Sequence, residues 1–215
     1  MAWSWQHVLL GLARDRRQRD DRSVFQIYAS GCSGDVTAGK YNDGSTGNRA
    51  VLADRLYQGM QAAWENTRRM PLERAEFRSA PLWLDFHQGP EFTADAMQKT
   101  LADPDAATDA RILAALGLSS RRRLERDQPI DVPCIDFGSA QLVVLPGEAF
   151  VGYQLMAQAM RPDSAVMCLG YGESWTGYIP TTSAFEEGFG HGWRWVAEGA
   201  EPQIRAALHR VLQPE

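Results

Sequence analysis

Apolar residues recur at two spacings along this chain, and the two spacings predict different elements. Positions three and four residues apart predict amphipathic helices, and these cover residues 5–19, 48–68, 93–100, 106–125, 149–160, 182–187 and 202–212. Alternating or continuous apolar runs predict strands, at residues 24–29, 74–86, 130–137, 140–145 and 165–169. The pattern predicts an α/β fold with a mixed sheet flanked by helices. A length of 215 residues suits one domain over 1–215.

Turn and cap residues refine the boundaries of these elements. Thr93 is typical of a helix N-cap, and Gly138 with Ser139 predicts a hairpin between the strands at 130–137 and 140–145. Pro81 predicts a break in the strand at 74–86. Residues 24–29 read as a short buried strand, and residues 30–47 as a glycine-rich functional loop.

The segment at 142–182 is the most informative part of the chain. It reads as strand, turn, helix, strand and glycine-rich loop, so both loops leave the carboxyl ends of neighbouring parallel strands, where α/β sheets place their sites. Pro146 and Gly147 end the first strand, and Glu148 stands where a helix is expected to begin. Free backbone N–H groups and the helix dipole would hold that carboxylate ionised. A purely structural role would be worth about 0.3–1 kcal/mol.

Composition and charge exclude several classes of protein. A net charge of −5 gives no electrostatic case for nucleic-acid binding, and no apolar run approaches the length of a membrane span. The N-terminus lacks the basic region of a signal peptide, so the chain as written would be cytoplasmic, although a longer parent could be exported. Three cysteines are too few for a disulfide framework.

Three motifs carry a resemblance to a known family. Residues 146–155 read PGEAFVGYQL, residues 170–181 read GYGESWTGYIPT, and residues 34–37 read GDVT. Together they resemble the neutral/alkaline (non-lysosomal) ceramidase family, in its bacterial ceramidase-like branch, over the C-terminal part of the catalytic domain. The resemblance implies a zinc-dependent amide hydrolase that acts on an N-acyl or related lipid-like amide.

The resemblance also implies roles for particular residues. Glu148 and Tyr178 would be zinc ligands. Asp35 and Thr37 would be catalytic, with Thr37 in place of the family's serine. Read from the residues themselves, Asp35 and the N–H groups of residues 33–37 would shape the anion-stabilising side of the site, and Gly34 would be substrate-binding; an Asx turn at Asp35 is the structural alternative.

Two further residues are candidates for substrate binding. Trp175 would line an apolar pocket or belong to the core, and His191 stands in a glycine-rich loop that could approach Glu148.

The family's two zinc-binding histidines come from upstream sequence that this chain does not match. We therefore expect weak zinc binding or none, and a non-catalytic small-molecule-binding or interaction domain is the alternative function. Apolar surface left uncovered by a missing part should also promote self-association. The candidate residues for that surface are Trp3, Trp5, Trp175, Trp193 and Trp195.

Overall fold

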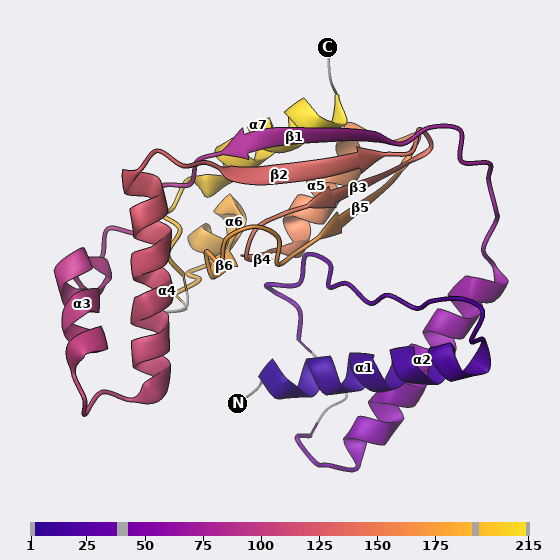
Figure 1. Cartoon of the computed structure of the whole chain (residues 1–215), viewed down its shortest axis with the longest axis horizontal. Helices are drawn as coiled ribbons and strands as arrows, with labels where there is room; N and C mark the ends of the chain where they lie inside the picture. The colour runs from indigo at the N-terminus through magenta and orange to yellow at the C-terminus, as the bar shows by residue number, and fades with distance from the viewer. Residues whose placement is uncertain (1–2, 38–42, 191–193, 214–215) are drawn as a thin grey trace. The chain divides into compact units, whose positions relative to one another are not determined.

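The computed structural model describes residues 3–37, 43–190 and 194–213, with the backbone alone for residues 3–10 (Figure 1). Its contacts divide the chain into two compact units. Unit 1 comprises residues 1–29 and 37–71, and unit 2 comprises residues 30–36 and 72–215. The single domain expected over 1–215 stays a prediction. Among the described helices, none has an apolar stretch long enough to cross a membrane.

Unit 1 is a pair of helices, α1 (Trp3–Asp20) and α2 (Asn48–Glu65), which pack against each other. Asp20 accepts a hydrogen bond from the hydroxyl of Tyr57 across the pair. The strand predicted at 24–29 is wrong, because no ladder forms there and Phe25 and Ile27 are exposed. An apolar run becomes a strand only where another strand satisfies its backbone groups.

A mixed sheet organises unit 2, as the sequence predicts. Its order is β1-β2-β3-β5, and the strands are β1 (Glu76–Leu82), β2 (Ile130–Asp136), β3 (Ala140–Val144) and β5 (Ala165–Leu169). The first two pairings are antiparallel and β3 pairs with β5 in parallel. Gly138 has a φ of +88° in the β2–β3 turn, which confirms the predicted hairpin. Pro81 does not break β1, because β1 is an edge strand and an edge tolerates proline.

Two helices cover one face of this sheet. Helix α5 (Val151–Met160) packs on β5, α7 (Ala200–Leu212) packs on β1 and β2, and the two helices contact each other (Figure 1). The α7 side chains that face the sheet recur at helical spacing and are fully buried: Ile204, Leu208, Val211 and Leu212. This layer forms the main hydrophobic core.

A smaller core lies beside α3 (Ala94–Ala102) and α4 (Thr108–Glu125), with a short 3-10 turn at Pro90–Phe92. Thr93 accepts a hydrogen bond from the Ala96 N–H at 3.2 Å, which confirms the predicted cap. Trp195 is buried in this core and Trp175 packs against it, with ring centroids 4.9 Å apart. These two tryptophans are therefore not the exposed surface that the sequence suggested. The side chains of Trp3 and Trp5, and all of Trp193, lie outside the described residues.

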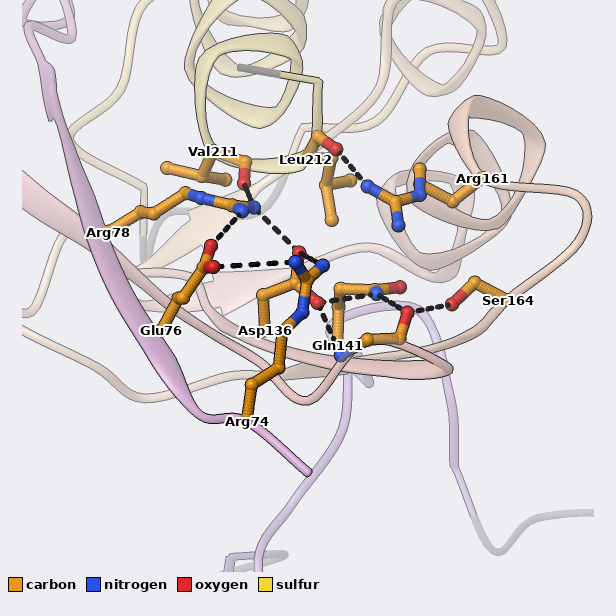
Figure 2. Close-up of polar contacts among 10 residues, drawn as sticks. Arg74, Glu76, Arg78, Asp136, Gln141, Arg161, Ser164, Val211 and Leu212 are labelled. Atoms are coloured by element: carbon orange, nitrogen blue, oxygen red, sulfur yellow. Dashed lines mark hydrogen bonds and ion pairs between the residues drawn. The ribbon is translucent and has the colours of Figure 1, made fainter. Parts of the chain in front are cut away.

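An ion pair between Arg78 and the buried Asp136 links the sheet to the end of α7 (Figure 2). Asp136 is fully buried and accepts a 2.8 Å bond from Arg78, which also reaches the Val211 carbonyl at 3.3 Å. Burial by itself would raise the pKa of Asp136. Bonds from Gln141, the Gly138 N–H and Arg78 outweigh burial and lower that pKa to about 2.

Candidate functional site

The candidate site forms just beyond the carboxyl ends of the parallel strands β3 and β5. The chain continues from β3 into β4 (Glu148–Ala149) and from β5 through a loop into β6 (Tyr178–Ile179), and β4 pairs with β6 in parallel. In this register Glu148 stands opposite Tyr178, and the Glu148 N–H donates to the Gly177 carbonyl at 2.9 Å. The two motifs at 146–155 and 170–181 are thus brought together by direct strand pairing.

Gly147 makes the turn before Glu148 possible. Its φ is +52°, and a β-carbon there would lie 2.3 Å from the Thr176 hydroxyl oxygen and 2.6 Å from the Gly177 carbonyl oxygen. Only glycine fits this close approach without displacing the loop. The proline–glycine pair therefore positions Glu148 as well as ending β3.

The predicted helix start at Glu148 is wrong. Glu148 belongs to a strand, and α5 begins three residues later at Val151. Asp35 provides the carboxylate at the N-terminus of α5. Its Oδ1 accepts a hydrogen bond from the Val151 N–H at 2.8 Å. Asp35 therefore caps a helix that is distant in sequence, an arrangement that stabilises the helix end.

The expectation that Glu148 is held ionised is also wrong. Its side chain is 5% exposed, and its Oε1 is buried with no hydrogen-bond partner among the described residues. Its Oε2 receives one long contact, at 3.5 Å, from the Tyr171 hydroxyl. Burial raises the pKa of Glu148 to about 7, and the weak bond from Tyr171 opposes this only slightly.

Two phenols flank the Glu148 carboxyl. Burial and then the nearby negative charge of Glu148 raise the pKa of Tyr171 to about 12, and the same two causes raise the pKa of Tyr178. Both phenols therefore stay protonated at neutral pH and can donate hydrogen bonds. The motif at 170–181 indicates Tyr178 as a site residue, whereas the position of Tyr171 beside Glu148 follows only from the folded chain.

Tyr171 is held in an unusual backbone conformation that only the structure reveals. Its φ is +59°, and its N–H donates to the Gly147 carbonyl at 2.9 Å. A non-glycine residue with positive φ is uncommon, and such positions cluster at functional sites. The only sequence signal was its place between two glycines in the loop after β5.

The predicted turn at Gly34 and Asp35 lies against Glu148. The Gly34 N–H donates to the Ala149 carbonyl at 3.1 Å, and a β-carbon on Gly34 would come 2.3 Å from the Glu148 carbonyl oxygen. Gly34, Asp35, Glu148 and Tyr178 are therefore brought together. Thr37 is exposed and falls in unit 1, so its catalytic role stays a prediction.

The two predicted substrate-binding residues beyond Gly34 have different outcomes. Trp175 lies in the smaller core, where Ser120 donates to its carbonyl at 3.1 Å, and it lines a concave pocket with Arg122 and Arg126. Its substrate role stays a prediction, in a pocket whose lining does not include Glu148. His191 lies outside the described residues.

The described residues do not fit a zinc site. A catalytic zinc site has three protein ligands and an open position, yet no group of three or more His, Cys, Asp or Glu in the described part of the chain could hold a metal ion. His87 is engaged elsewhere, because its Nδ1 accepts from the Gly89 N–H at 2.9 Å and its Nε2 lies 2.6 Å from an Arg194 nitrogen. His209 is exposed in the last turn of α7. Beside Glu148 the described residues add only the phenols of Tyr171 and Tyr178, which stay protonated at neutral pH.

Comparison with known proteins shows a similarity of fold. Neither a family model nor a curated protein matches the sequence. A neutral ceramidase from Pseudomonas aeruginosa has a similar structure, with a TM-score of 0.63 over 94% of this chain at 13% sequence identity. The fold is ceramidase-like. A second solved structure, a ceramidase complexed with C2, matches 94% of this chain with a TM-score of 0.62 at 13% identity.

The similarity has a limited extent. The matched region covers 40% of the Pseudomonas aeruginosa chain and 41% of the second ceramidase chain, so this chain spans about two fifths of their length. At this identity the comparison establishes the ceramidase-like α/β fold.

Proposed function

We propose that this chain is a ceramidase-like hydrolase domain that binds an N-acyl amide and exchanges a proton with it through Glu148. The observation that carries the proposal is the buried Glu148 carboxyl, whose Oε1 has no partner among the described residues. Leaving a buried carboxyl oxygen unpaired costs stability, so such a group is a candidate for a functional role. The ceramidase-like fold and the motif at 146–155 support the same assignment.

Glu148 and its neighbours suit the chemistry of amide hydrolysis. With a pKa of about 7, Glu148 is present in both forms near neutral pH. Its carboxylate can accept a proton from an attacking water, and its acid form can return one to the departing amine. The hydroxyls of Tyr171 and Tyr178 are donors for the oxygen that gains negative charge.

The ceramidase resemblance also implies zinc, which supplies Lewis-acid chemistry when it is bound. Because no group of three or more His, Cys, Asp or Glu among the described residues could hold a metal ion, the proposed steps use the side chains of Glu148, Tyr171 and Tyr178 alone.

An aromatic cluster beside the carboxyl supports a lipid-like amide as the substrate class. Phe150 and Phe189 lie edge to face with ring centroids 5.1 Å apart, and Tyr178 contacts both of them at 6.4 and 5.8 Å. Phe150 is buried in the main core, whereas Tyr178 and Phe189 are only partly buried against it, so these two rings are the ones that could contact an acyl chain. We therefore expect amides with longer acyl chains to bind better than acetyl amides.

The test is hydrolysis of a series of fluorogenic N-acyl amides of increasing acyl length. Glu148→Gln keeps the shape of the side chain and removes the proton exchange, so we expect kcat/KM to fall by about 100-fold or more. Glu187→Gln, the same change at an exposed position, is the control and should retain full activity. Equal activity of the two variants would refute the role of Glu148. Running the series with chelator and with added zinc shows whether a metal contributes.

A non-catalytic binding domain is the second candidate. It is favoured by the lack of a complete metal-ligand set in the described residues. Under this alternative the wild-type chain would bind N-acyl amides without turnover, and Glu148→Gln would alter affinity alone. Calorimetric binding of a non-hydrolysable N-acyl analogue, measured beside the activity assay, distinguishes the two functions.

A further inference from the structure

Cys32 and Cys168 lie opposite each other in a short antiparallel contact. Gly31 forms an antiparallel bridge with Leu169, and the Gly170 N–H donates to the Ser30 carbonyl at 3.0 Å. Continuing this register by one residue places Cys32 opposite Cys168, with both side chains on the same side. Opposed residues in antiparallel strands have Cα atoms about 4.5–5.5 Å apart, which is within the range that a disulfide spans.

The two thiols interact and differ in acidity. Both are buried, Cys32 at 7% and Cys168 at 2% exposure, and both are free. A hydrogen bond from Cys168 lowers the pKa of Cys32, and it outweighs burial and the negative charge of Asp35, which both oppose it; a backbone hydrogen bond from Gln154 in α5 adds a smaller lowering. The same thiol pairing, followed by burial, raises the pKa of Cys168. A donor thiol and a helix N–H beside Cys32 favour its thiolate, the reactive form of cysteine.

Cys134 provides an internal comparison. It stands opposite Val143, and Val143 stands opposite Cys168, so one strand separates the two cysteines. Strands lie about 4.8 Å apart, which puts these Cα atoms about 10 Å apart. A disulfide cannot bridge that distance without backbone movement. Burial raises the pKa of Cys134, which disfavours its thiolate.

We propose that Cys32 and Cys168 are a redox modification site, at which a hydroperoxide converts the two thiols into a reversible disulfide. The Cys32 thiolate attacks the peroxide, forming a sulfenic acid and releasing one water after protonation. The Cys168 sulfur then attacks the Cys32 sulfur, forming the S–S bond and releasing the second water. Two thiols and one hydrogen peroxide thus give one disulfide and two waters. A dithiol reductant reverses the link by thiol–disulfide exchange.

The disulfide would restrain residues 30–36, which lie beside the candidate site. Cys32 is two residues from Gly34, which bonds the Ala149 carbonyl, and three residues from Asp35, which caps α5. Joining Cys32 to Cys168 ties this segment covalently to β5. We therefore expect oxidation to slow local opening of residues 30–36 beside Glu148.

The test is to treat the folded full chain with hydrogen peroxide, block free thiols by alkylation, and map peptides without reduction. We expect a cross-linked pair of peptides containing Cys32 and Cys168, an alkylated Cys134, and loss of the cross-link on adding dithiothreitol. Cys134→Ala should form the same cross-link, whereas Cys32→Ala and Cys168→Ala should form none. Hydrogen exchange at the Gly34 amide should slow on oxidation in the wild type and in Cys134→Ala.

Each other outcome overturns the proposal. A sulfinic acid on Cys32 with no cross-link would show that Cys168 does not reach it. A cross-link to Cys134, or one that forms only in denaturant, would show that the folded chain does not hold the pair in register. Because the peptide map requires no substrate or turnover, its failure is distinct from failure of the proposed hydrolase.

Discussion

Replacing Glu148 by glutamine should make the stability of the protein less sensitive to rising pH. The wild-type carboxyl is 5% exposed and one of its oxygens is unpaired among the described residues, so the folded state disfavours its ionised form. Glutamine has nearly the same shape and stays neutral at every pH. Comparing the two chains therefore isolates the cost of ionising one buried group.

The magnitude follows from the pKa of Glu148. Folding raises it from 4.5 to about 7, and one pKa unit corresponds to about 1.4 kcal/mol, which gives about 3 kcal/mol. Because the folded-state value is the higher one, the folded protein binds the proton more tightly than the unfolded chain does. The resulting stability is fully present below pH of about 4.5 and is lost as the pH rises through about 7. The free energy of unfolding of Glu148→Gln, minus that of the wild type, should therefore rise by about 3 kcal/mol across this range.

Urea unfolding of both chains in the presence of a chelator, at several pH values, measures this difference. Other titrating groups cancel in the subtraction, and Glu187→Gln, an exposed change of the same kind, should show no pH-dependent difference from the wild type. A difference that is flat or falls with pH would refute the account of Glu148 as a buried, unpaired carboxyl. If added zinc removes the difference, Glu148 binds the metal in its ionised form.

Three other changes test the rest of the structure. Asp136→Asn should lower the free energy of unfolding by about 2 kcal/mol at neutral pH. The lowered pKa of Asp136, about 2, means that this contribution is lost as the pH falls from about 4 to about 2; acid unfolding curves that coincide for variant and wild type would contradict it. Gly34→Ala should cost about 1–3 kcal/mol, because its β-carbon would come 2.3 Å from the Glu148 carbonyl oxygen. Gly59→Ala, a helical position with open space, should instead stabilise by about 1 kcal/mol, and thermal melts compare the two. Elemental analysis after dialysis should find little or no zinc, whereas a near-stoichiometric amount would refute that expectation and make His191→Ala the next variant to measure.

The elements that local patterns specify were predicted well. The helices α4 and α7, the hairpin across Gly138 and the Thr93 cap all lie within one or two residues of their predicted places. Each depends on residues within a few positions of one another, through helical periodicity, turn conformation or a side-chain bond to the next turn. The parallel pairing of β3 with β5 followed from the strand–helix–strand order.

Only the tertiary structure decided the character of the candidate site. The sequence predicts Glu148 as a carboxylate at a helix start, which free N–H groups and the helix dipole would hold ionised. In the folded chain, residues 30–36 and the loop that carries Tyr171 pack against Glu148. The resulting burial of its carboxyl raises its pKa, whereas the dipole rule predicts a lowered one. Burial depends on segments that meet from distant parts of the sequence, and periodicity carries no information about such meetings.

The same reason explains the other differences. The apolar run at 24–29 satisfies the local pattern of a strand but forms no ladder, and a strand depends on its partner as much as on its own residues. The sequence left open whether Trp195 belongs to the core or to exposed apolar surface, and the structure buries it against α3 and α4. The sequence by itself determined which segments coil, extend and turn, because those choices are made within a few residues. Packing between distant segments decided the rest. It buries the Glu148 carboxyl away from water, places Tyr171 and Tyr178 beside it, and brings Cys32 opposite Cys168.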